Sequence, residues 1–527
     1  MHIKKQQLSA FITIVLSGII TLFYFYNGKI QAPGGCPHFF AWADSLLKFG
    51  QLNIHYVQRD VGYPILILLS GYTMTGDIKI LLLFHFIFSF SSPIIVYLTF
   101  KDYNKILASI SALVFAASSL PSNLALFIHH DIFHIFLLNI GLFFCCLYIK
   151  SNTPKNLYYG VALLFLASIT RPVSKFFVII MIICMLFSAW YKNDKLKFRT
   201  NLSALISCLI LFFAYSVYRN LIFTNKLLCN LPSYTGTQIF YGPYVNSKEY
   251  NINLNNIKTS ALQSIKTSIL YEITKDRDSF NKYILAGDLK KSEKDEKVSL
   301  TNDEMVTEMF NNPYAAYFHY FTNGMFLNPK NNQDFIIASA DIAFHELSFI
   351  PRYTMRNMFH GMFDPSFIHP RWSTNFTQAG ISCLFSDKLE GPDFTALQIP
   401  SRETITRFNQ YAGILETREI ILKYIDTAYR LYYRRIICIL GAIGLLNIGF
   451  VLLRIGNPDL NKIFILLEGN IWYHNLIVSL TAEPFDRYQQ IWLMSVYICC
   501  IISLINLTVL FKNMPHSIHA FWQTRKY

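Results

Sequence analysis

Residues 57–69 read VQRDVGYPILILL, in which a charged pair and a Gly-Tyr-Pro turn lead directly into an uninterrupted apolar run. Arg59 and Asp60 therefore stand at the mouth of a segment with the composition of a membrane helix. Pro64 suits the first turn of a helix and ends any helix that precedes it. The stretch predicts a helix that begins at a membrane boundary, with charged side chains held just outside it.

The composition extends this interpretation to the whole chain. Of the 527 residues, 53% are hydrophobic and 15% are charged, which leaves too little polar surface to cover a soluble globule. The net charge of +14 comes from lysines and arginines that fall mainly in short loops between apolar runs, so it indicates membrane topology and not nucleic-acid binding. We expect an all-α polytopic membrane protein with no nucleic-acid partner.

About ten segments have the apolar character of a membrane span, which needs about 20 residues. They lie at 9–26, 79–100, 105–121, 132–149, 157–170, 176–191, 202–222, 434–454, 462–480 and 490–511. The first of them lacks the small-residue cleavage site of a signal peptide, so we expect it to remain as an anchor.

The basic loops predict one orientation for these spans. With the N-terminus inside, nearly every short basic loop lies on the cytoplasmic side, as at 101–105 and 191–199. An odd number of spans then precedes the largest polar block and places it outside the cytoplasm. We expect a membrane module at 1–222, a mainly helical extracytoplasmic domain at 223–433, and a second membrane module of three spans with a cytoplasmic tail at 434–527.

The first predicted outer loop contains two acids, Asp44 and Asp60. Within it, HFFAWADSLLKFG at 38–50 has the spacing of an amphipathic helix that lies flat on the bilayer. Both carboxylates therefore lie on the outer side of the predicted topology.

A second outer stretch, FIHHDIFHIF at 127–136, groups His129, His130, Asp131 and His134 at the end of a span. Three interpretations stay open for it. Asp131 favours the positive end of a helix dipole and fits a helix cap. The cluster also fits substrate binding, and the four-residue spacing of His130 and His134 is one that can hold a metal on one helix face.

Two further outer stretches carry cations. SITRPVSK at 168–175 places Arg171 and Lys175 at the depth of a lipid phosphate, where a guanidinium suits bidentate binding; the alternative is two interface charges that reach up to water. TAEPFDRYQQ at 481–490 adds Arg487 and Tyr488. The chain has no phosphate loop, G-x-G-x-x-G, G-x-S-x-G or H-E-x-x-H motif, so ATP-driven pumps, dinucleotide enzymes, serine esterases and zincins lose their usual support.

Taken in order, these motifs resemble those of the GT-C superfamily of integral membrane glycosyltransferases. RDVGYP at 59–64 is similar to the family's R-P-P-G-Y-P turn, Thr170-Arg171-Pro172 is similar to its turn between two spans, and Arg487-Tyr488 is similar to its late outer motif. The resemblance covers the order of elements in the first 222 residues and in the last membrane module. It implies transfer of a sugar from a polyprenyl-phosphate carrier on the outer side of the membrane.

The reaction implied by the resemblance is a single displacement with inversion, in which one carboxylate deprotonates the acceptor hydroxyl and cations stabilise the leaving phosphate. Asp44 and Asp60 both stay open as the base. The expected phosphate partners are Arg59, Arg171, Lys175 and Arg487. The residues expected near the sugar are Tyr63, His129, His130 and Asp131, with Tyr488 also in the substrate site. No cofactor and no metal is assigned.

The expected partners are a polyprenyl-phosphate-linked sugar, a glycan or lipid-linked acceptor such as lipopolysaccharide O-antigen, and membrane lipids. The compact basic loops favour a bacterial inner membrane with the site facing the periplasm, ahead of the endoplasmic reticulum. Two alternatives stay open: a polymerase or ligase of lipid-linked oligosaccharides, and a flippase or transporter of lipid-linked sugars.

Overall fold

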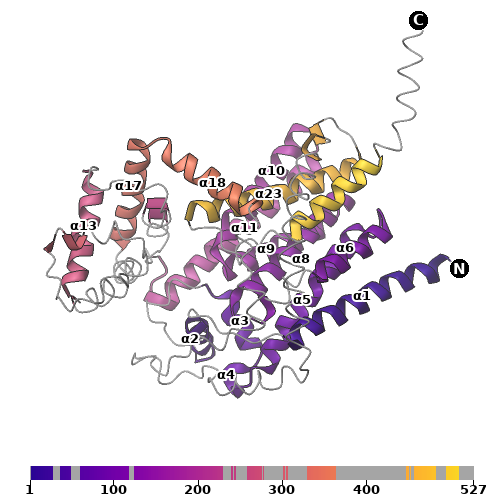
Figure 1. Cartoon of the computed structure of the whole chain (residues 1–527), viewed down its shortest axis with the longest axis horizontal. Helices are drawn as coiled ribbons and strands as arrows, with labels where there is room; N and C mark the ends of the chain where they lie inside the picture. Colours follow the sequence, from indigo (N-terminus) through magenta and orange to yellow (C-terminus); the bar gives the residue numbers. More distant parts are fainter. Residues whose placement is uncertain are drawn as a thin grey trace, which may run out of the picture.

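The computed structural model describes part of the chain, and every regular element in that part is a helix (Figure 1). The described residues are 2–27, 36–48, 60–117, 124–126, 128–228, 239–240, 243–244, 258–275, 277, 301–302, 304–306, 329–363, 447–449, 451–452, 456–481 and 494–509. The predicted all-α class is confirmed for these residues.

In the described part of the chain, five helices are long and apolar enough to cross a membrane, which is compatible with an integral membrane protein. They are Lys79–Phe100, His130–Ser151, Pro172–Tyr191, Lys195–Thr224 and Pro458–Leu480. Shorter apolar helices cover Ala10–Phe23, Lys105–Ala117 and Met494–Val509. The total of ten spans stays a prediction, and most of the segment 434–454 lies outside the described residues.

The apolar helices pack side by side around one continuous core (Figure 1). The bundle consists of α1 (His2–Asn27), α5 (Lys79–Phe100), α6 (Lys105–Ala117), α8 (His130–Ser151), α9 (Pro154–Thr170), α10 (Lys175–Tyr191), α11 (Lys195–Thr224) and α23 (Pro458–Thr481). Helices α8 and α9 approach closely because glycines face each other: a Cβ added at Gly160 would lie 2.6 Å from Cys145 Sγ. Small residues permit the same close packing in membrane helices generally.

The connections between these helices fall at two opposite ends of the bundle. At one end Lys150, at the end of α8, forms an ion pair with Asp102 in the turn between α5 and α6. The hydrogen bond from Lys150 holds the pKa of the Asp102 carboxyl below its usual value. This end is the basic one, which the positive-inside rule predicts to be cytoplasmic.

The opposite end holds the short helices α2 (Cys36–Lys48), α3 (Gly62–Leu69) and α4 (Tyr72–Thr75), together with the start of α8 (Figure 1). The amphipathic helix predicted in the first outer loop is present as α2. Its buried face is wider than the sequence pattern indicated, because Phe39 to Ala43 are all buried against protein. Trp42 stacks edge-on against Phe223 of α11, and Phe39 contacts Tyr63 of α3.

Helices α13 (Ser260–Lys275), α17 (Pro329–His345) and α18 (Phe349–Phe363) surround a separate apolar core that includes Ile265 and Phe335. Helix α18 is joined to α23 by an amide hydrogen bond, 2.9 Å long, from Asn475 Nδ2 to the carbonyl of Met358. These helices fall within the block predicted as an extracytoplasmic domain. The boundaries at 222 and 433 stay predictions, since much of that block lies outside the described residues.

Gly62, the first residue of α3, lies directly against Thr170, the last residue of α9. A Cβ added at Gly62 would lie 2.1 Å from Thr170 Oγ1 and 2.7 Å from Thr170 Cα. Only a residue without a side chain fits here. The described part of the RDVGYP turn, residues 60–64, is therefore packed directly on the TRP turn.

The substitution Gly62→Ala should destabilise the protein by at least about 1–3 kcal/mol, because the added methyl group meets backbone as well as side chain. Thermal unfolding in detergent, followed by size-exclusion chromatography, measures the effect. Trimming the neighbour with Thr170→Ala in the same chain should not restore stability, because the clash with its Cα remains.

The control is Gly469→Ala on α23, where no described atom lies within 4 Å of the added Cβ. Alanine is favoured over glycine inside a helix by up to about 1 kcal/mol, so this variant should unfold at the wild-type temperature or above it. Equal melting temperatures for Gly62→Ala and Gly469→Ala would contradict the proposed contact.

Candidate functional site

Asp60 is a buried carboxylate with cations on both sides. It is 3% exposed, and its Oδ1 accepts a hydrogen bond of 2.7 Å from the hydroxyl of Tyr215. Arg219 Nη1 lies 3.5 Å from Oδ1, and Lys175 Nζ lies 3.7 Å from Oδ2. Oδ2 accepts no hydrogen bond from any residue of the described part. One oxygen is thus fixed, while the other keeps its acceptor capacity.

Two of these partners, Tyr215 and Arg219, were not expected from the sequence. They lie one turn apart on the same face of α11, near its end. The available signal was Arg219 itself, the one charged residue in the apolar segment 202–222. An ionisable residue inside such a segment is a reason to expect a buried partner.

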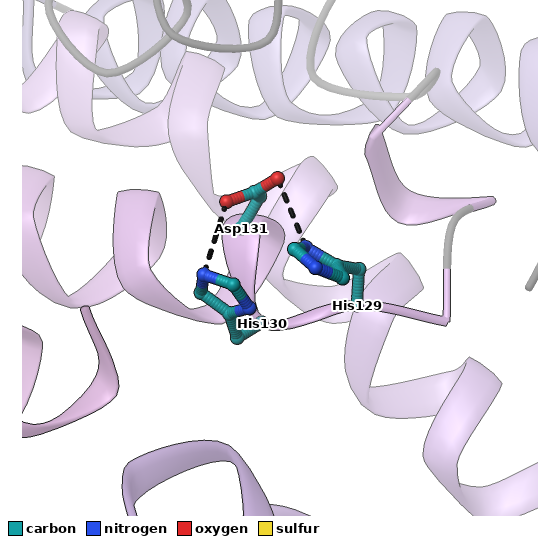
Figure 2. A group of neighbouring side chains, drawn as sticks. All are labelled: His129, His130 and Asp131. Atoms are coloured by element: carbon teal, nitrogen blue, oxygen red, sulfur yellow. Dashed lines mark hydrogen bonds and ion pairs between the residues drawn. The ribbon is translucent and has the colours of Figure 1, made fainter. Parts of the chain in front are cut away.

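Asp131 is the second buried carboxylate, at 3% exposure, and it lies in the first turn of α8. Arg171 Nη1 lies 2.6 Å from its Oδ1 and His129 Nδ1 lies 3.0 Å from its Oδ2. His130 Nε2 lies 3.5 Å from Oδ1 (Figure 2). Arg171 and the His-His-Asp cluster thus lie together, while their expected roles in binding substrate stay predictions. The position of Asp131 in the first turn also fits the helix-cap interpretation.

Arg171 reaches Asp131 because the chain leaves helical geometry at this residue. Its φ of −146° and ψ of 117° are extended, between the end of α9 and the short 3-10 helix η2 (Pro172–Ser174). The following proline favours such a conformation in the residue before it. The TRP turn therefore directs the guanidinium toward α8 and begins α10 with Lys175 beside Asp60.

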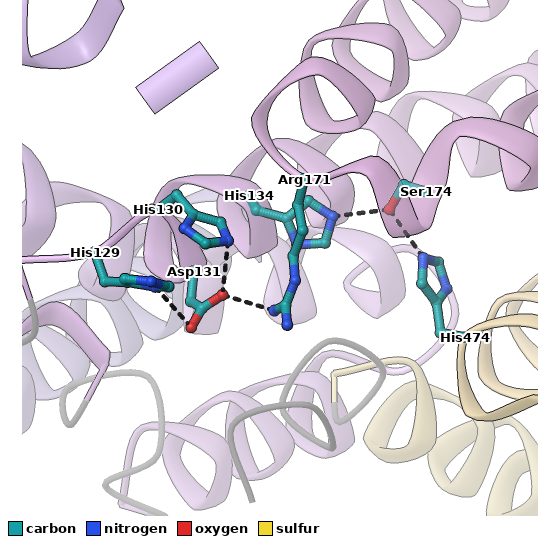
Figure 3. Close-up of polar contacts among 7 residues, drawn as sticks. All are labelled: His129, His130, Asp131, His134, Arg171, Ser174 and His474. Atoms are coloured by element: carbon teal, nitrogen blue, oxygen red, sulfur yellow. Dashed lines mark hydrogen bonds and ion pairs between the residues drawn. The ribbon is translucent and has the colours of Figure 1, made fainter. Parts of the chain in front are cut away.

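His134 lies in a chain of hydrogen bonds with Ser174 and His474. Its Nε2 lies 2.8 Å from Ser174 Oγ, and the same oxygen lies 2.9 Å from Nε2 of His474 on α23 (Figure 3). The three side chains are buried, and they connect helices whose residues are 300 positions apart in sequence. Neither Ser174 nor His474 stood out in the sequence. The metal-binding pair of His130 and His134 stays a prediction.

The donor and acceptor of each hydrogen bond between His134, Ser174 and His474 follow from the last contact, in which His474 meets a backbone carbonyl. His474 Nδ1 lies 3.0 Å from the carbonyl of Asn470 and must donate to it. With neutral rings, His474 Nε2 then accepts from the Ser174 hydroxyl, and the Ser174 oxygen accepts from His134 Nε2–H. These hydrogen bonds hold Ser174 in place at the start of α10, three residues after Arg171.

Tyr63, expected near the sugar, is wholly buried, and its hydroxyl lies 3.1 Å from His85 Nε2. His85 Nδ1 donates to the carbonyl of Ala125 over 2.9 Å, so its Nε2 accepts from Tyr63.

Asp44 is partly exposed on α2 and pairs with Lys48 at 2.7 Å, one turn along the same helix. Arg59, Arg487 and Tyr488 lie outside the described residues, and their roles stay predictions.

Cations gather around the two buried carboxylates at this end of the bundle. Asp60 contacts Lys175 and Arg219, and Asp131 contacts Arg171. Lys175 is the most exposed of these cations, with 27% of its side chain accessible. Cations in a poorly hydrated setting attract an anion.

Comparison of the chain with known protein families, curated proteins and solved structures finds no match. The function must therefore be inferred from the residues of the site and their geometry.

Replacing Ser174 with alanine should lower stability by about 1–3 kcal/mol, because buried nitrogens of His134 and His474 lose their shared partner. Thermal unfolding in detergent measures the loss. Ser168→Ala is a matched control: Ser168 is also buried, but it bonds only the Leu164 carbonyl of its own helix, so the cost should be no more than about 1 kcal/mol. Equal losses of stability in the two variants would show that the hydrogen bonds from Ser174 to the two histidines do not stabilise the protein.

Proposed function

We propose that this chain is an integral membrane glycosyltransferase, similar to the GT-C superfamily, that transfers a sugar from a polyprenyl-phosphate donor to an acceptor hydroxyl on the outer side of the membrane. One observation carries the proposal. Two turns that resemble motifs of that superfamily pack together through Gly62 and Thr170, and they bring two buried carboxylates and three cations to one end of an apolar bundle.

The cluster of cations, with Lys175 partly exposed, supports a phosphate as the ligand. In the transfer, the bond between the anomeric carbon and the phosphate oxygen breaks, and its electron pair leaves with the phosphate. Cations fixed in advance where this negative charge develops lower the barrier. Lys175 is best placed for this role, since its ammonium group is partly accessible and lies at the start of a predicted span. Arg171 and Arg219 add to the field around it.

Asp60 is the proposed general base. Its Oδ1 is held by Tyr215, whereas Oδ2 has lone pairs to accept the proton of an incoming hydroxyl. As that proton moves to Oδ2, the acceptor oxygen forms the new bond to the anomeric carbon from the face opposite the phosphate. Asp44 is the weaker candidate, because it lies partly exposed on α2 in an ion pair with Lys48.

The acceptor class is proposed from the predicted topology. The basic end of the bundle, around Lys150, is expected to face the cytoplasm, so the cluster around Asp60 would face the periplasm of a bacterial cell. Cell-envelope glycans such as lipopolysaccharide O-antigen are the acceptors available to a lipid-dependent enzyme there. The block 223–433, with its own apolar core, is the proposed place for acceptor recognition.

The substitution Asp60→Asn should reduce sugar transfer by about 100- to 10,000-fold, the range expected for loss of a general base. The assay supplies purified protein in detergent with a radiolabelled polyprenyl-phosphate hexose and a crude envelope glycan. Asp44→Asn should retain most of the activity. Asp102→Asn, the same change at the opposite end of the bundle, controls for the loss of a paired carboxylate.

Full activity in Asp60→Asn would remove Asp60 as the base. If the wild type transfers no sugar but moves labelled lipid across liposomes, the chain is a flippase and the proposed reaction is wrong.

A further inference from the structure

The side chains of His129, His130 and Asp131 converge although they are consecutive in the chain. One ligand atom from each, an imidazole nitrogen or a carboxylate oxygen, lies within 4.8 Å of the other two (Figure 2). All three residues are buried, with exposures of 6%, 7% and 3%. The two imidazole rings are close neighbours, with centroids 3.9 Å apart.

A change of backbone conformation produces this convergence. Consecutive side chains alternate between faces in a strand and are about 100° apart in a helix. Here His129 is extended, with φ of −150° and ψ of 158°, and the helix begins at His130. The junction turns both rings to the side of the Asp131 carboxylate, as Figure 2 shows.

Each imidazole lies at a distance from the carboxylate that is close to the spacing in a metal coordination shell. With bonds of about 2.0–2.1 Å to a tetrahedral zinc ion, neighbouring ligand atoms lie about 3.3 Å apart. His129 Nδ1 is 3.0 Å from Oδ2 of Asp131, and His130 Nε2 is 3.5 Å from the other oxygen, Oδ1. Side-chain rotations that bring both imidazoles to the same carboxylate oxygen would complete the shell, since one ligand atom of each residue already lies within 4.8 Å of the others.

We infer that His129, His130 and Asp131 form a binding site for a divalent transition-metal ion of the zinc type. Two imidazoles and one carboxylate suit zinc, iron, nickel or copper, whereas magnesium and calcium prefer oxygen ligands. The set differs from the pair His130 and His134 that the sequence spacing indicated, since the ligand atoms that converge come from His129, His130 and Asp131.

Neighbouring residues define how the ion would be held. Arg171 occupies the Oδ1 side of Asp131 at 2.6 Å and repels a cation there, so the ion is placed nearer Oδ2 and His129. Phe39 of α2 contacts both imidazole rings, with centroids at 5.5 and 5.0 Å. Its ring covers one side of the cluster.

The test measures metal bound to the full-length protein, expressed with zinc in the medium and purified in detergent. Elemental analysis should find about one zinc per chain, and a strong chelator should lower the melting temperature while magnesium fails to restore it. His129→Gln and His130→Gln should lose the zinc. His85→Gln should keep it, since His85 is a buried histidine that bonds Tyr63 and Ala125 instead.

Zinc-free wild-type protein, or unchanged zinc in both cluster variants, would overturn the inference. If the variants do not fold, X-ray absorption at the zinc edge of the wild type provides the test. A spectrum with two imidazole ligands supports the site, and a spectrum without imidazole ligands rejects it. The inference stands apart from the proposed sugar transfer, because bound metal is measured without substrate.

Discussion

The contact between Gly62 and Thr170 is the constraint on which the rest of the site depends. A Cβ at position 62 would lie 2.1 Å from Thr170 Oγ1, so the two turns can meet only because residue 62 has no side chain. That contact fixes Asp60, two residues before Gly62, and Arg171, one residue after Thr170. Each of these then pairs across the bundle, Asp60 with α11 and Arg171 with α8. A local steric requirement thereby sets the position of charges from separate helices.

Pairing makes these buried charges tolerable. An isolated carboxylate loses its hydration on burial at a cost that only partners can offset, and removing one partner leaves the other uncompensated. Asp60 and Asp131 meet this requirement through Lys175, Arg219 and Arg171. The hydrogen bonds from His134 through Ser174 to His474 join the same turn to α23, so the arrangement extends from the N-terminal helices to a helix near the other end of the sequence.

Local patterns predicted the elements but not their partners. The apolar run at 79–100 coincides with α5, and the amphipathic pattern at 38–50 found α2. The sequence also singled out Asp60, Asp131, Arg171 and Lys175, because charged residues at the ends of apolar runs are conspicuous. Tyr215 and His474 were missed because their contacts lie 155 and 300 residues away along the chain and depend on how helices pack. Helix periodicity predicts which face of a helix is buried, whereas the helix that packs against that face is decided by tertiary structure.

We propose that the cations at this end of the bundle bind the phosphate of a polyprenyl lipid. Native mass spectrometry of the purified protein with polyprenyl phosphate and with the uncharged polyprenol measures this binding. We expect the wild type to retain the phosphate lipid and not the alcohol, Lys175→Gln to lose this preference, and Lys150→Gln at the opposite end to keep it. Equal retention of the two lipids by the wild type, or an unchanged preference in Lys175→Gln, would show that these cations do not select the phosphate.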